Sequence, residues 1–153
     1  MTKESLLKLF VDNTTHYFKH LSRESVEVQV PYLIAHHEPV IFDYTGIIGI
    51  SGAYKGYVYL TAPSKMMRFL LQTQGEQDYS EPHCLDIIGE IANVLAGNVR
   101  RELGAEFMIS VPLRIAGQPD KLLLTDKSWS FAIPIRYSLF IAALVVSLEE
   151  CVM

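Results

Sequence analysis

The sequence predicts an α+β domain, an antiparallel-rich sheet packed with long helices on one face. The elements come in the order helix, strands, helix, strands, and this order is typical of such a domain. Two pairs of strand-like runs lie close together in the chain, and two long helices each carry one apolar side. With 153 residues the chain is long enough for a sizeable core, so we expect one domain over residues 1–153.

Composition and net charge indicate a globular protein and argue against several classes of partner. Half of the residues are hydrophobic and the mean hydropathy is +0.21, as in a packed globular protein. The net charge is −4 and no basic run occurs, so neither nucleic acid nor an anionic membrane is an expected partner. The longest apolar run, Leu139 to Leu148, is too short to span a bilayer, and we expect no membrane insertion.

The cysteines and the first residues favour the cytoplasm. Cys84 and Cys151 form no CxxC motif and are expected to be free thiols in a reducing compartment. The opening residues MTKESLLKLF mix charges into an amphipathic pattern, which differs from the continuous apolar core of a signal peptide.

The first elements follow from their periodicity. Residues 3–21 carry apolar side chains at helical spacing and predict a helix. Residues 25–30 alternate strictly, which predicts a strand that Pro31 ends or bends.

A hairpin and a short helix come next. Residues 40–50 and 53–61 predict two strands joined by a Ser-Gly turn. Residues 63–73 begin with proline and predict a short helix, which Gly75 ends.

The C-terminal third predicts strands only. Residues 106–115 are expected to form one strand that contains Pro112, and a turn follows. Residues 128–136 and 138–149 predict a closing antiparallel pair. The last strand is very apolar, so we expect one face against helices and the other against something else. One expectation is that an edge or a face of the sheet forms the interface of a homodimer.

Between these halves lies the longest predicted helix, residues 80–104. Ser80 and Pro82 supply helix-start chemistry, and Gly104 suits a left-handed position after the last turn. Stepping about 100° per residue places the apolar side chains on one broad arc. They are Leu85, Ile87, Ile88, Ile91, Ala92, Val94, Leu95, Val99 and Leu103.

The opposite side of this helix carries the candidate site. Glu90 and Asn93 are three residues apart and therefore neighbours on the surface. Asp86 lies one turn before Glu90. Gly97 lies one turn after Asn93 and costs a helix about 1 kcal/mol relative to alanine, but it leaves room for another molecule beside the amide. From spacing alone, an ordinary solvated helix face is the favoured interpretation.

Familiar catalytic signatures are missing from the sequence. It contains no Walker loop, GxSxG or HExxH motif. His36 and His37 are adjacent and point in different directions, which argues against a metal site. Cys84 lies at a helix start, but its neighbour His83 cannot face it, so a packing role is favoured over a nucleophilic one.

The segment DIIGEIANVLAGNVRREL, followed by a strand with Pro112, resembles the CheC/CheX/FliY phosphatases of bacterial chemotaxis. The matching pattern is Asp86-x-x-x-Glu90-x-x-Asn93 followed by Gly97 and Asn98. CheC-type proteins carry the Glu-x-x-Asn pair twice, and here it occurs once, so the sequence is most similar to the CheX branch. The resemblance thus implies the CheC/CheX-like version of the α+β fold.

The resemblance implies an enzyme that hydrolyses the phospho-aspartate of a CheY-like response regulator. It assigns Asn93 to the attacking water and Glu90 to the regulator's lysine. Asp86, Gly97 and Arg100 are the expected partner-binding residues. No cofactor of the chain's own is implied, because Mg²⁺ would be bound by the regulator. Two alternatives stay open: a non-catalytic module that binds a regulator, and a small-ligand sensor with its site between helix and sheet.

Overall fold

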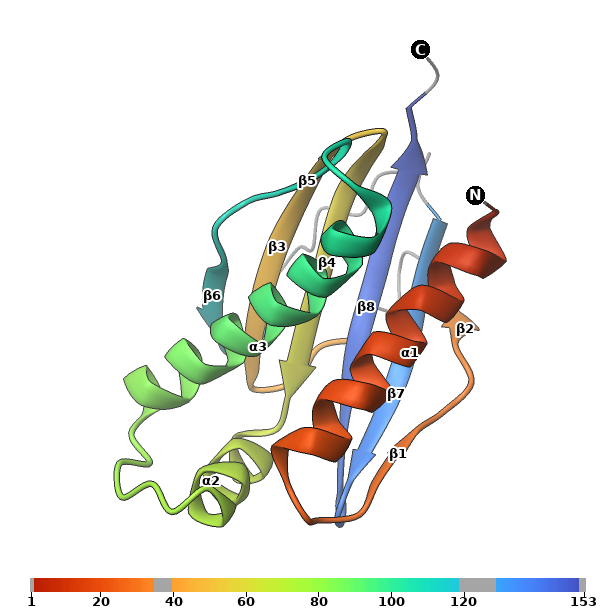
Figure 1. The fold of residues 1–153 in the computed structure, drawn as a ribbon. Coiled ribbons are helices and arrows are strands. Elements are labelled where there is room, and N and C mark those ends of the chain that lie inside the picture. Colours follow the sequence, from red (N-terminus) through yellow and green to blue (C-terminus); the bar gives the residue numbers. More distant parts are fainter. Residues whose placement is uncertain (1, 35–39, 119–128, 152–153) are drawn as a thin grey trace.

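The computed structural model describes residues 2–34, 40–118 and 129–151. Within these ranges two long helices, α1 (Lys3–Leu21) and α3 (Glu81–Leu103), lie across one face of a sheet, and the shorter α2 (Ser64–Thr73) lies at one end of it (Figure 1). None of the helices in these ranges is long and apolar enough to cross a membrane. The predicted arrangement, an antiparallel sheet with helices on one face, is confirmed.

The sheet has eight strands among the described residues, and every pairing is antiparallel. The order is β1-β7-β8-β4-β3-β5, with β2 also paired to β7 and β6 to β3. The strands are β1 (Val26–Val28), β2 (Tyr32–Leu33), β3 (Tyr44–Gly52), β4 (Tyr54–Ala62), β5 (Phe107–Ile109), β6 (Leu113–Ala116), β7 (Trp129–Tyr137) and β8 (Phe140–Glu150).

The predicted single strand over residues 106–115 is wrong. The structure has two short strands, β5 and β6, which both pair with β3 and are separated at Ser110–Pro112. Proline has no N–H to give to a sheet ladder, which favours an interruption here. The Ser110 hydroxyl accepts the Gly49 N–H at 2.8 Å across this gap and so keeps the segment against β3.

The last strand is not a sheet edge, contrary to one expectation from its apolar sequence. β8 lies between β7 and β4, and residues 142–148 are all buried. One face of β8 packs under the helices. On the other face Ala143 and Val145 join a second apolar cluster that includes Ile34 and Tyr59 of this same chain. Burial on both faces explains the continuous apolar run.

The ends of α3 follow the predicted chemistry with one difference. The Ser80 hydroxyl accepts the His83 N–H at 3.4 Å, and Pro82 lies in the first turn. Gly104 ends the helix with φ 93°, a value that favours glycine, and its N–H donates to the Arg100 carbonyl. Its ψ of −172° is extended, so the residue leaves the helix without the left-handed helical turn that was predicted.

A glycine in β3 sets how closely α3 lies on the sheet. A Cβ added at Gly46 of β3 would lie 2.8 Å from the Ile88 carbonyl oxygen and 2.9 Å from the Gly89 Cα. Both atoms belong to the backbone of α3, so no side-chain rotation could relieve the contact. The absence of a side chain at Gly46 therefore brings the middle of α3, just before Glu90 and Asn93, directly onto β3.

Candidate functional site

The candidate residues lie on the side of α3 that faces away from the sheet. Asp86, Glu90, Asn93 and Arg100 are all exposed, while Ile88, Ile91, Ala92 and Leu95 on the opposite side are buried in the core. Glu90 and Asn93 stand one helical turn apart on this outward side, as their spacing predicts. A rigid helix that is fixed to the sheet therefore presents both side chains to an approaching molecule.

Gly97 is half-buried rather than bare. A Cβ added to it would lie 4.0 Å from the Ile109 Cδ1 atom of β5, which is ordinary van der Waals contact. The fold of the chain itself therefore does not require glycine at this position. Because packing within the chain does not explain the glycine, room for a partner remains the role expected of Gly97.

Tyr17 of α1 borders the site on one side. Burial raises the pKa of the Tyr17 phenol, and the nearby negative charge of Glu90 raises it further. This electrostatic interaction places Glu90 near the surface where α1 packs beside α3. Tyr17 therefore stays protonated at neutral pH, and its hydroxyl remains able to donate a hydrogen bond.

Arg114 borders the site on the other side, and sequence reasoning missed it. It lies on β6, and its Nε is 3.5 Å from the Asp86 Oδ1. The sequence contained no usable signal for this pairing, because the residue was assigned to one long strand of unknown register. In the structure Arg114 lies opposite Gly46 of β3. That register puts it on the helix-bearing face of the sheet.

Cys84 has the predicted packing role. Its side chain is fully buried, burial raises the pKa of the thiol, and the Sγ lies 3.7 Å from the Tyr79 carbonyl oxygen. A buried thiol with a raised pKa is a poor nucleophile at neutral pH. His36 and His37, the pair weighed as a metal site from the sequence, lie outside the described residues.

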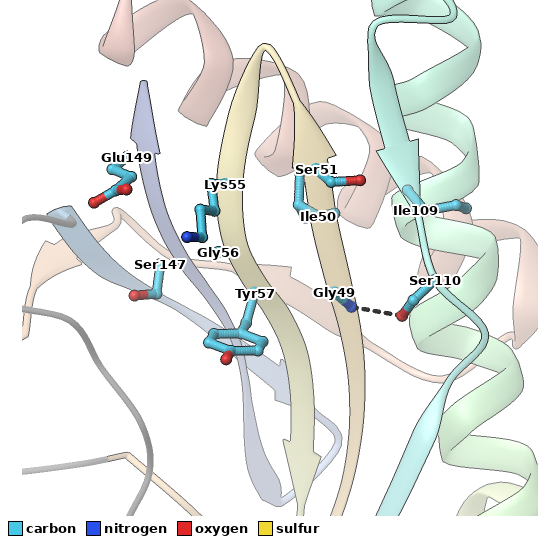
Figure 2. A pocket seen from close by; sticks show the side chains of 10 residues that line it. All are labelled: Gly49, Ile50, Ser51, Lys55, Gly56, Tyr57, Ile109, Ser110, Ser147 and Glu149. Atoms are coloured by element: carbon cyan, nitrogen blue, oxygen red, sulfur yellow. Dashed lines mark hydrogen bonds between the residues drawn. The ribbon is translucent and has the colours of Figure 1, made fainter. Parts of the chain in front are cut away.

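A shallow hollow of about 390 Å³ lies elsewhere on the molecule, over β3, β4 and β8 (Figure 2). Tyr57 and Ser147 line it. Tyr57 alternates along β4 with Val58, which belongs to the core under the helices, so the hollow is on the opposite face of the sheet. It is therefore separate from Glu90 and Asn93. The described cavities thus give no support to a ligand site between α3 and the sheet.

Comparison with known protein families identifies the chain. The family model "Chemotaxis phosphatase CheX" matches residues 44–136, a stretch that contains the whole of α3. A search of curated protein sequences gave no significant match.

Solved structures agree with this assignment at the level of the fold. A CheC-like superfamily protein from Shewanella sp. PV-4 has a TM-score of 0.83 at 19% identity, over 98% of this chain and 100% of that one. The chemotaxis protein CheX from Vibrio vulnificus has 0.80 at 21%, over 95% and 99%. A CheX–CheY–BeF3–Mg²⁺ complex from Borrelia burgdorferi has 0.78 at 19%, over 94% and 97%. Since the family model covers more than half of the sequence, the chain belongs to the CheX family of chemotaxis phosphatases.

Proposed function

We propose that this protein hydrolyses the phospho-aspartate of a CheY-like response regulator. The observation that carries the proposal is the pair Glu90 and Asn93, exposed one turn apart on a helix that lies within the family match. The solved complex of a CheX with CheY, BeF3 and Mg²⁺ supports a regulator of this kind as the partner.

Asn93 positions the attacking water. An acyl phosphate is ready to hydrolyse, so the barrier lies mainly in holding a water molecule in line with the phosphorus atom. An amide offers both a donor and an acceptor and carries no charge, so it orients water without repelling the phosphoryl oxygens. The side chain is exposed on α3, where it can enter a partner's pocket while its backbone stays fixed.

Glu90 docks the regulator. Its carboxylate binds the lysine of the regulator's phosphorylation pocket and so fixes the register of α3 over the phosphoryl group. In free solution such an exposed pair contributes only about 0–1 kcal/mol, but an interface that excludes water strengthens it. Asp86, Gly97 and Arg100 extend the contact along the same side of the helix, and Mg²⁺ belongs to the regulator.

We also propose that the protein works as a homodimer in the cytoplasm. Two unpaired cysteines, Cys84 and Cys151, are consistent with a reducing compartment. For the dimer, the support is the exposed apolar side chains along the β5–β6 side of the sheet. Met108 is 48% exposed, Val111 85% and Leu113 61%.

Phosphate release across a panel of phosphorylated regulators from the same cell tests the proposal. The wild-type protein accelerates the decay of at least one of them, and Asn93→Ala loses most of that acceleration. Removing one positioned hydrogen-bonding group costs on the order of 2–4 kcal/mol, roughly 30-fold to 10³-fold in rate. Gln72→Ala on α2 removes an exposed amide far from the site and keeps full activity.

Binding measurements separate the enzyme from a non-catalytic module. If the wild-type protein binds the phosphorylated regulator but leaves its decay unchanged, the catalytic part of the proposal is wrong. If Asn93→Ala retains full acceleration, the assignment of the water to Asn93 is wrong.

A further inference from the structure

Arg114 reaches α3 from a different part of the chain. It follows the β5–β6 interruption, and the pairing of β6 with β3 places it opposite Gly46, under the middle of α3. Its side chain is 37% exposed and its Nε contacts the Asp86 carboxylate at 3.5 Å. Arg114 is thus a partly exposed cation that contacts the outward side of α3 at Asp86, about two turns before Asn93.

Gly89 makes the space in which this guanidinium lies. A Cβ added at Gly89 would meet the Arg114 side chain first, with Nε at 2.6 Å, Cγ at 3.0 Å and Cζ at 3.1 Å. Gly89 directly precedes Glu90 and lies one turn before Asn93. The helix therefore lacks a side chain at a position where the Arg114 side chain lies against it.

The charges around Asn93 suggest a role for Arg114 at this position. The outward side of α3 presents two carboxylates, Asp86 and Glu90, next to the amide of Asn93. The proposed substrate is itself anionic, since it carries a phosphoryl group and the oxygen ligands that hold Mg²⁺. In the proposed complex the regulator's lysine compensates Glu90, which leaves Asp86 as the uncompensated carboxylate on this side of α3. A cation beside Asp86 would therefore favour the approach of an anionic phosphoryl group. Arg114 is the described cation that contacts this part of α3.

We propose that Arg114 is a substrate-binding residue of this site, whose guanidinium receives an anionic oxygen of the phosphorylated regulator. The inference rests on the proposed function and adds a residue from outside α3 to it. The ion pair with Asp86 engages Nε, and the described residues offer no hydrogen bond to the two terminal amino groups. These groups form a fork that suits phosphoryl or carboxylate oxygens. Because Asp86 is 70% exposed, its pair with Arg114 is weak enough to allow a partner's oxygens to bind.

Substitution of the cation is the first test. Arg114→Gln lowers kcat/KM for the phosphorylated regulator by about tenfold, and Arg114→Lys, which keeps the charge but loses the fork, recovers part of it. The activity of Arg114→Gln also depends less on salt than that of the wild type, because a screened ionic contact has been removed. Arg136→Gln is the matched control, since Arg136 is exposed on β7 and its neighbours Ile135 and Tyr137 face the helices.

Gly89→Ala tests the geometry without touching any charge. The new methyl group displaces the Arg114 side chain, and alanine favours the helix, so the thermal midpoint does not fall. We expect a loss in kcat/KM similar to that of Arg114→Gln, and no further loss in the double variant Gly89→Ala/Arg114→Gln. A purely structural role for Arg114 predicts the opposite, a lower midpoint for Arg114→Gln with unchanged affinity and salt dependence.

Two forms of the regulator show which oxygen is bound. If Arg114 contacts the phosphoryl group, Arg114→Gln weakens binding to the BeF3–Mg²⁺ form and leaves binding to the unmodified form unchanged. If it contacts a carboxylate of the regulator, both forms bind more weakly. The inference is overturned if Asn93→Ala is inactive while Arg114→Gln keeps wild-type kcat/KM and affinity. Failure of the wild-type protein to bind any phosphorylated regulator removes both proposals together.

Discussion

At the scale of single residues, the proposed site divides its work between a neutral and a charged side chain. In the proposed complex Asn93 faces the phosphoryl group and carries no charge, whereas Glu90, one turn earlier, is charged. Exchanging these properties should be harmful for electrostatic reasons, because a carboxylate at position 93 meets the oxygens of the substrate. The sequence predicted both side chains and their outward direction, because helical spacing alone places them.

Asn93→Asp tests the importance of neutrality. The side chain keeps its size but gains a negative charge that repels the phosphoryl group, so we expect phosphatase activity at or below that of Asn93→Ala. Since residue 93 is exposed, the free energy of unfolding should change by less than about 0.5 kcal/mol. Phosphate release and urea unfolding of the same preparation measure the two effects. Activity close to wild type would contradict the role given to the amide.

Glu90→Gln tests the docking role. Loss of the carboxylate should increase the dissociation rate of the regulator, by about tenfold or less, while Asn93 still positions water in the complex that forms. Surface binding kinetics against the BeF3–Mg²⁺ form of the regulator report this rate directly. An unchanged dissociation rate would remove Glu90 from the interface.

Cys84 and Cys151 should differ in reactivity. Cys84 is fully buried and burial raises its thiol pKa, so less of the reactive thiolate is present at neutral pH. Cys151 is only partly buried. Treatment of the folded protein with iodoacetamide at pH 7.5, followed by peptide mass spectrometry, should modify Cys151 well before Cys84. Equal modification of both would show that the start of α3 opens readily.

At the scale of elements, the close contact between α3 and β3 fixes the height of the site above the sheet. Gly46 has no side chain where the α3 backbone passes, and Gly89 has none where Arg114 passes. The sequence predicted the helix and its ends from periodicity and caps. It could not predict this contact, because neither glycine follows a local rule and each is explained only by an element distant in the chain.

Gly46→Ala should therefore be strongly destabilising. The added methyl group would lie 2.8 Å from the Ile88 carbonyl oxygen, and moving a helix backbone away typically costs about 1–3 kcal/mol. Gly49→Ala on the same strand is the control, since its methyl would meet only the Ser110 side chain, with Oγ at 3.3 Å and Cβ at 3.5 Å. Urea unfolding gives both values. Equal stability of the two variants would show that α3 is not tightly seated on β3.

At the scale of the whole molecule, the sheet brings together residues that the sequence keeps apart. Antiparallel strands and helices on one face were predictable from period and turn residues. The central place of β8 and the division of residues 106–115 into β5 and β6 were not, since both depend on which strands pair. Arg114 was missed for the same reason. A site built from one helix is visible in a sequence, and a contribution from another strand requires the fold.

The decay of one purified phosphorylated regulator, followed with a substoichiometric amount of this protein, tests the central claim most directly. We expect the wild-type protein to turn over many regulator molecules, with Asn93→Ala and Asn93→Asp both close to the spontaneous rate and Gln72→Ala as active as wild type. Turnover by the two position-93 variants at the wild-type rate would contradict the claim that the exposed amide of α3 places the attacking water.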